Sequence, residues 1–154
     1  LKTYLIEKEN FLQDISISYR LLFNNEIIID RLPFGEIESA ENTVTLKEGS
    51  EIITLSTFGL RAVHKSAAQI SLDEDLNLTV STFPGICILK LIAYSDRPDE
   101  RAKDIEDINF IIEKYADMNL EYICNEHYDI MSNNWDENLS ARVLGRDMKK
   151  IMKK

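Results

Sequence analysis

The pattern of apolar positions changes about halfway along the chain. Up to residue 82, short apolar runs, several of them alternating with polar residues, predict strands, whereas from Phe83 onward apolar residues recur at helical spacing. The predicted strands are 15–23, 26–32, 43–46, 51–57 and 75–82, and the predicted helices are 1–12, 58–71, 83–97, 102–118, 120–131 and 137–154. We therefore expect an α+β fold, with a small mixed sheet in residues 1–82 and a helical half in residues 83–154, both in one structural unit.

Two hairpins follow from the turn residues between these strands. Asn24 and Asn25 separate the first two strands, and asparagine tolerates the positive φ that a two-residue turn requires. The sequence KEGS, residues 47–50, separates the next two strands in the same way. Antiparallel neighbours are expected in both places.

The strand at 26–32 ends in an aspartate. Its three consecutive isoleucines lack the alternation of a half-exposed strand, so the pattern predicts a central strand covered on both faces, with Asp30 near its end. A buried carboxylate is costly unless it has a partner. Either Asp30 caps the following turn and contacts water, or a positive group lies beside it.

A second candidate lies in the helical half. Lys90 is the only charged residue between Phe83 and Tyr94, and Asp104 falls within the apolar stripe of the next helix, with Asp107 at the edge of that stripe. One interpretation is a buried Lys90–Asp104 ion pair that orients two helices. The other is that Lys90 faces an anion in a cleft, with the aspartates holding the lysine or a metal.

Composition and net charge argue against some classes of function. The chain has 154 residues and a formal net charge of −9, which opposes a broad phosphate-backbone interface. No apolar run approaches the roughly 18 residues of a membrane span, and no secretion signal is visible, so a cytoplasmic protein without membrane contact is expected. Cys87 and Cys124 are predicted to be buried thiols, and His64 and His127 structural residues.

Several stretches together resemble a known family. IDRLPFGEIE, then TFPGICILKLIAYSDRPDERAKDIEDINFIIEKY, then LSARVLGRDM resemble, in that order, the AbiEii/AbiGii-type predicted nucleotidyltransferases of bacteria. The resemblance covers roughly residues 19–151. That family is similar in turn to the DNA polymerase β-like nucleotidyltransferase fold.

The resemblance implies an activity and a site. It implies transfer of a nucleoside monophosphate from an NTP to an RNA or protein hydroxyl, in a toxin–antitoxin or phage-defence setting, with a tRNA end as one acceptor and an antitoxin protein as a partner. Asp30 would hold Mg²⁺ or Mn²⁺ as the third metal carboxylate. Lys90 would contact the nucleotide phosphates, and Asp104 or Asp107 would support the site. Asp104 is favoured because it lies within the apolar stripe of its helix, whereas Asp107 lies at the edge of that stripe.

The chain also departs from the family pattern. A Gly-Ser or Gly-Gly loop and a DxD pair are expected before the first helix, and neither is present in these residues. We therefore expect an N-terminal part of the native protein to be missing. The alternatives are a non-catalytic nucleotidyltransferase-like module that binds a partner or nucleotide, and an ordinary structural domain with a buried Lys90–Asp104 pair.

Overall fold

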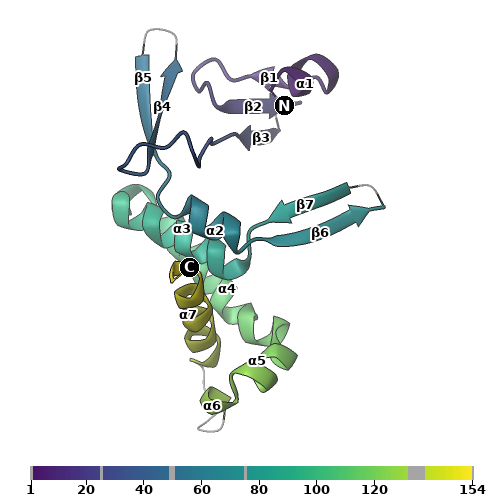
Figure 1. Cartoon of the computed structure of the whole chain (residues 1–154), viewed down its shortest axis with the longest axis vertical. Coiled ribbons are helices and arrows are strands. Elements are labelled where there is room, and N and C mark those ends of the chain that lie inside the picture. Colours follow the sequence, from purple (N-terminus) through teal and green to yellow (C-terminus); the bar gives the residue numbers. More distant parts are fainter. Residues whose placement is uncertain (1, 25, 49–50, 75, 132–137, 154) are drawn as a thin grey trace. The chain divides into compact units, whose positions relative to one another are not determined.

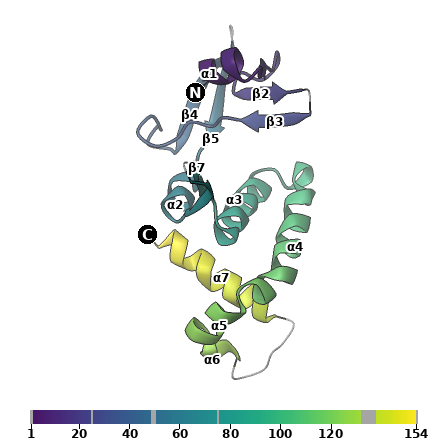
Figure 2. The ribbon, with the colours of Figure 1, turned by 90° about the vertical axis from the view of Figure 1, so that its right-hand side faces the viewer.

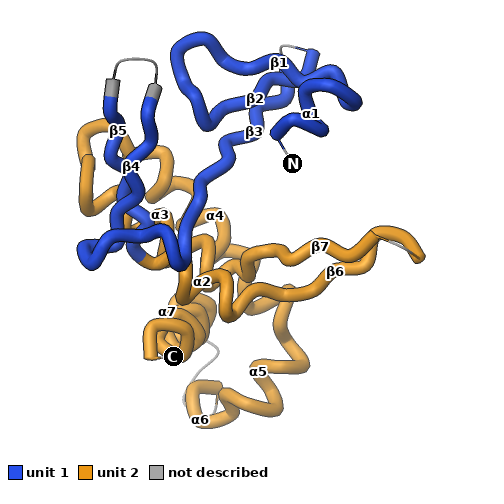
Figure 3. Tube along the Cα trace, turned by 45° about the horizontal axis from the view of Figure 1, so that its top comes forward, with its two compact units in different colours: residues 1–58 blue, residues 59–154 orange. Residues whose placement is uncertain are grey.

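The protein is a mixed α+β chain with small antiparallel sheets, in a computed structural model that describes residues 2–24, 26–48, 51–74, 76–131 and 138–153. The chain divides into two compact units, Leu1–Phe58 and Gly59–Lys154, which are coloured separately in Figure 3. The division falls at residue 58, whereas the sequence suggested a boundary at residue 82 within one unit.

The first unit contains a three-stranded sheet and a separate hairpin. Helix α1 (Lys2–Lys8) precedes β1 (Leu12–Gln13), β2 (Arg20–Phe23) and β3 (Ile27–Asp30), which pair antiparallel in the order β1-β2-β3. Strands β4 (Thr43–Glu48) and β5 (Glu51–Ser56) form the second hairpin. Both predicted hairpins are confirmed. Asn24 has the expected positive φ of 51°, while Asn25 and residues 49–50 lie outside the described residues.

The predicted burial of the strand that carries Asp30 is wrong. Strand β3 is an edge strand of the described sheet, and Ile27 and Ile28 are 54% and 56% exposed. The isoleucine run reflects strand propensity, because β-branched side chains suit extended backbone whether or not both faces are covered. The unit's buried apolar side chains include Leu21 of β2 and Val44 of β4 instead.

The second unit is built mainly on helices, of which the longest have 14, 17 and 14 residues (Figures 1 and 2). Its elements are α2 (Leu60–Lys65), β6 (Ala68–Asp73), β7 (Leu76–Val80), α3 (Phe83–Asp96), the 3-10 turn η1 (Pro98–Glu100), α4 (Ala102–Met118), α5 (Leu120–Glu126), α6 (Tyr128–Met131) and α7 (Leu139–Met152). Helices α3, α4 and α7 pack against one another in pairs. The antiparallel β6–β7 hairpin extends away from them in Figure 1.

Helix α3 begins where the sequence predicts. The side chain of Thr82 accepts a hydrogen bond from the Gly85 amide, and Pro84 lies in the first turn, where its missing N–H has no helical partner to lose. Gly85 allows close packing of α2, because a Cβ there would lie 2.9 Å from Cγ1 of Val63. The helix therefore starts against α2 and leads directly to Lys90.

Some predicted helices have different extents. The helix expected at 1–12 ends at Lys8, and Leu12 lies in β1, where it pairs with β2. The helix expected at 58–71 ends at Lys65, and Ala68–Asp73 forms β6, because its apolar residues alternate and pair with β7. The helix expected at 120–131 is two helices, with His127 between them at φ −130°. Helix α4 has the predicted bounds.

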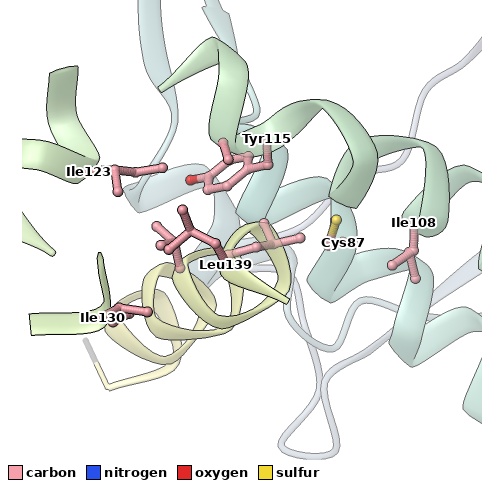
Figure 4. Close-up of a cluster of buried hydrophobic side chains, with 9 residues drawn as sticks. Cys87, Ile108, Tyr115, Ile123, Ile130 and Leu139 are labelled. Atoms are coloured by element: carbon pink, nitrogen blue, oxygen red, sulfur yellow. The ribbon is translucent and has the colours of Figure 1, made fainter. Parts of the chain in front are cut away.

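Two apolar clusters join α3 to α7, one of them through Ile88 and Ile151, and the larger one also includes residues of α4, α5 and α6. The buried members of the larger cluster are Cys87, Ile108, Tyr115, Ala116, Ile123, Ile130, Leu139, Val143 and Leu144. Figure 4 shows Tyr115 close to Leu139 at the start of α7, with Ile123 and Ile130 to one side and Cys87 to the other. The Cys87 thiol is buried as predicted, but Cys124 is exposed, because it lies on the outer face of the short helix α5.

Candidate functional site

Lys90 joins two carboxylates from the next long helix. Its Nζ lies 3.0 Å from Oδ1 of Asp104 and 2.6 Å from Oδ2 of Asp107. Helix α3 supplies the lysine and α4 the aspartates, and these two helices pack together. The predicted association of Lys90 with Asp104 is confirmed, and Asp107 is part of the same cluster.

The two aspartates have different surroundings. The Asp104 side chain is 13% exposed, whereas that of Asp107 is 41% exposed. Oδ2 of Asp104 is buried and has no hydrogen-bond partner among the described residues; Nη1 of Arg101 lies 3.8 Å away. Asp104 is therefore held inside the structure, while Asp107 can exchange its partner for solvent or a ligand.

The cluster keeps its lysine charged. The hydrogen bond to Asp107 raises the pKa of Lys90 above its usual value, against the opposing effect of burial, and Asp104 adds to the increase. The same bond lowers the pKa of Asp107. Further positive groups lie near the two carboxylates, Arg101 beside Asp104 and Lys103 near Asp107.

Asp30 has a positive partner within its own sheet. Arg20 lies opposite Asp30 in the β2–β3 register and binds both carboxylate oxygens, with Nε at 2.7 Å from Oδ1 and Nη2 at 2.9 Å from Oδ2. This bidentate pair lowers the pKa of Asp30. Two explanations were open for a carboxylate on this strand. The structure supports the second, because a positive group, Arg20, lies beside Asp30.

Three of the four predicted site residues lie together. Lys90, Asp104 and Asp107 form one cluster in the second unit, whereas Asp30 lies in the first unit. Among the described residues no group of three or more His, Cys, Asp and Glu side chains could hold a metal ion. Both oxygens of Asp30 are already bound by Arg20, so the residues around it do not fit the Mg²⁺ or Mn²⁺ ion that the resemblance implies. A metal at Asp30 remains a prediction.

A second polar cluster was missed from the sequence. Asp147 of α7 is 8% exposed and accepts hydrogen bonds from the hydroxyl of Tyr115 at 2.9 Å, the hydroxyl of Tyr122 at 2.7 Å and Nζ of Lys150 at 2.9 Å. Burial opposes ionisation here, but these bonds together lower the pKa of Asp147. It is therefore a buried carboxylate whose charge is satisfied by three donors.

The sequence contains a signal that Asp147 is buried and needs partners. Leu139, Val143, Asp147 and Ile151 recur every fourth residue and form the buried row of α7. An aspartate within such a row needs partners, which is the argument that identified Asp104. The partners, two tyrosines from α4 and α5, could not be found from the pattern.

His127 extends this cluster inward. The ring is 2% exposed, and its Nε2 lies 3.1 Å from the Tyr122 hydroxyl. Because that hydroxyl donates to Asp147, it accepts from His127, which places the proton on Nε2. Nδ1 is then a buried acceptor with no partner among the described residues. His127 is a core residue, as predicted.

No helix in the described part is long and apolar enough to cross a membrane.

Comparisons with known proteins do not identify the chain. No protein-family model, no curated protein and no solved structure matches this sequence.

Proposed function

We propose that this protein contributes a nucleotide-phosphate site to nucleotidyl transfer, with Lys90 as the residue that binds phosphate and with Asp104 and Asp107 as the residues that position it. The reaction would move a nucleoside monophosphate from an NTP to a hydroxyl of RNA, such as a tRNA end, or of a protein. The observation that carries the proposal is the Lys90 ammonium held between two carboxylates of the following helix.

The chemistry of the cluster supports this role. An ammonium has three N–H donors, and Lys90 uses two of them on Asp104 and Asp107, which leaves one for a phosphate oxygen. The hydrogen bond to Asp107, with a smaller contribution from Asp104, raises the pKa of Lys90 and so stabilises the protonated form that binds phosphate. Because Asp107 is the more exposed partner, its bond can be exchanged for a phosphate contact while Asp104 continues to hold the lysine.

The order of the residues gives further support. Lys90 lies in the KLIAYSDR stretch and the aspartates in the KDIED stretch, which carry the resemblance to the AbiEii/AbiGii-type nucleotidyltransferases. That resemblance also suggests a toxin role and an antitoxin partner. Asp30 has no part in the proposed phosphate site, because Arg20 binds both of its carboxylate oxygens.

A second function is favoured by one observation. Asp30, the carboxylate to which the resemblance assigns metal binding, is tied at both oxygens by Arg20. A non-catalytic module that binds a nucleotide at Lys90 without transferring it needs no such carboxylate. Such a module would make the same phosphate contact as the nucleotidyltransferase, but it would not catalyse transfer.

The experiment has a binding arm and a transfer arm. In the first, binding of each NTP to the chain is measured by equilibrium dialysis for wild type, Lys90→Met and Lys114→Met. Lys114 is an exposed lysine on the same helix as the aspartates and is the matched charge control. We expect Lys90→Met to weaken binding about tenfold or more, as loss of a charged hydrogen bond does, and Lys114→Met to leave it unchanged.

In the second arm, α-labelled NTPs are incubated with the protein, magnesium, and total cellular RNA and protein. Label transferred by wild type and lost in Lys90→Met supports transfer and identifies the acceptor; Asp30→Asn tests the role of that carboxylate. Lys90-dependent binding without transfer supports the module. Equal affinity of folded wild type and Lys90→Met for every NTP would reject both functions and leave a structural ion pair.

A further inference from the structure

The second unit contains a groove that the proposed nucleotide site does not use. Its volume is about 670 Å³, within the range of small-molecule pockets. One wall is the β6–β7 hairpin, through Ala68, Ile70 and Val80, and the other is formed by residues of α3, α4, α5 and α7. Lys90 and its aspartates are not among the lining residues.

The hairpin presents its apolar face to this groove. In the strand register Ala68 pairs with Val80 and Ile70 with Leu78, which places four apolar side chains on one face. Gln69 and Thr79 pair on the other face and are hydrogen-bonded at 2.6 Å. The wall is therefore apolar on the groove side only.

The apolar side of the groove remains exposed to solvent. Ile70 is 41% exposed and Val80 is 37% exposed, and Phe83 on the opposite wall is 41% exposed. These side chains would lose contact with water on binding an apolar group, which favours such binding.

One end of the groove is polar and is built around Asp147. Tyr115, Tyr122, Asp147 and Lys150 all line it. Oδ2 of Asp147 is bound by the Tyr115 hydroxyl, and Oδ1 by the Tyr122 hydroxyl and Lys150 Nζ, so the carboxylate has donors on both oxygens. The polar end therefore offers little to a cationic ligand.

Lys150 has capacity left for an anion. Its Nζ donates to Asp147 at 2.9 Å and to the Tyr122 hydroxyl at 2.8 Å, which leaves one of its three N–H groups. The side chain is 57% exposed, and these two bonds fix the position of the ammonium at the edge of the groove. A ligand oxygen can reach it without displacing either bond.

We propose that this groove binds a small organic anion with an apolar body, with the apolar part between the hairpin and the helices and the anionic group on Lys150. Among the described residues that line the groove, Lys150 is the cation, and together with the apolar walls it defines this chemistry. The site is separate from the Lys90 cluster, so it does not depend on nucleotide binding.

The test compares two probes that differ only in the anionic group. These are 8-anilinonaphthalene-1-sulfonate and its uncharged analogue N-phenyl-1-naphthylamine, both followed by fluorescence. We expect saturable binding of one sulfonate probe per chain, roughly two- to fivefold tighter than the neutral probe, as an exposed ion pair allows. In Lys150→Gln the preference should disappear, and in Lys149→Gln, an exposed neighbour outside the groove, it should persist.

A second set of variants tests the apolar wall. Ile70→Glu should weaken both probes about tenfold or more, because it places a charge against their apolar rings. Gln69→Glu introduces the same side chain on the opposite face of the same strand and should have little effect on the neutral probe. Circular dichroism would verify that each variant folds.

Three results would overturn the proposal. The first is a sulfonate preference that persists in Lys150→Gln, and the second is equal probe binding by folded Ile70→Glu and Gln69→Glu. The third is a dimer in sedimentation that Ile70→Glu converts to monomer, since a second copy of the chain would then occupy the groove. Because Lys90→Met leaves this groove intact, failure here is distinguishable from failure of the nucleotide site.

Discussion

The two lysine–aspartate clusters of the helical unit use the same residue types in opposite ways. At Lys90 one ammonium is shared by two carboxylates, whereas at Asp147 one carboxylate is shared by an ammonium and two tyrosine hydroxyls. In the first cluster the lysine is central and one partner, Asp107, is exchangeable. In the second the aspartate is central and buried. The first arrangement can release a donor to a ligand, and the second holds three helices together.

The largest effect should come from removing the central carboxylate. Asp147→Ala leaves the Tyr115 hydroxyl buried without its acceptor and should lower the free energy of unfolding by about 2–4 kcal/mol. Urea denaturation at neutral pH measures this. Asp129→Ala, which removes an exposed partner of Arg146, is the control and should cost much less. A similar loss in both variants would show that Asp147 contributes no more to stability than an exposed ion-pair partner does.

Removing the central lysine should have a smaller effect. Lys90→Met leaves Asp104 without its main partner, and we expect a loss of about 1–3 kcal/mol, because Asp107 can still turn to water. Replacing both members, in Lys90→Met with Asp104→Leu, should restore most of that stability. A double variant that is less stable than Lys90→Met alone would show that Lys90 and Asp104 do not stabilise the fold as an ion pair.

The buried carboxylate also predicts a pH dependence. Because the pKa of Asp147 in the folded protein is lowered from an unfolded value of about 3.9, its contribution is present above that value and is lost as the pH falls through the folded pKa. The difference in unfolding free energy between wild type and Asp147→Asn should therefore narrow from pH 6 to pH 2.5. A constant difference would show that the carboxylate has an unshifted pKa.

The smallest effect is expected at Arg20 and Asp30. This pair is bidentate, but Asp30 lies on an edge strand and both side chains are partly exposed, so solvent screens the pair. Arg20→Gln, Asp30→Asn and the double variant form a mutant cycle, and their coupling should be weak and should decrease in high salt. A strong coupling that persists in high salt would mean that the edge of this sheet is more strongly shielded than its exposure indicates.

The sequence predicted the elements whose signals are local. The bounds of α4, the start of α3 at Thr82 and Pro84, and both hairpins of the first unit follow from periodicity, capping and turn residues within a few positions. The association of Lys90 with Asp104 was also predictable, because each residue interrupts an apolar pattern and the two helices are consecutive.

Where pairing with a distant segment decides the outcome, the sequence was a poor guide. Residues 68–73 form a strand because β7 supplies its hydrogen bonds, and β3 is an edge strand because no further strand of the described sheet covers it. The tyrosines that surround Asp147 come from α4 and α5, 32 and 25 positions earlier in the chain. Neither their proximity nor the partner of Asp30 has a local signature.

The sequence by itself therefore determined the helices and hairpins that have local signals, and it showed that Asp30, Lys90 and Asp104 need partners, because both follow from short-range geometry and the cost of burying a charge. Only the tertiary structure decided the partners that come from other segments without a local signal: Arg20 for Asp30, and the two tyrosines for Asp147. The physical reason is that partner choice depends on how segments pack, which the side-chain pattern of any one segment does not encode.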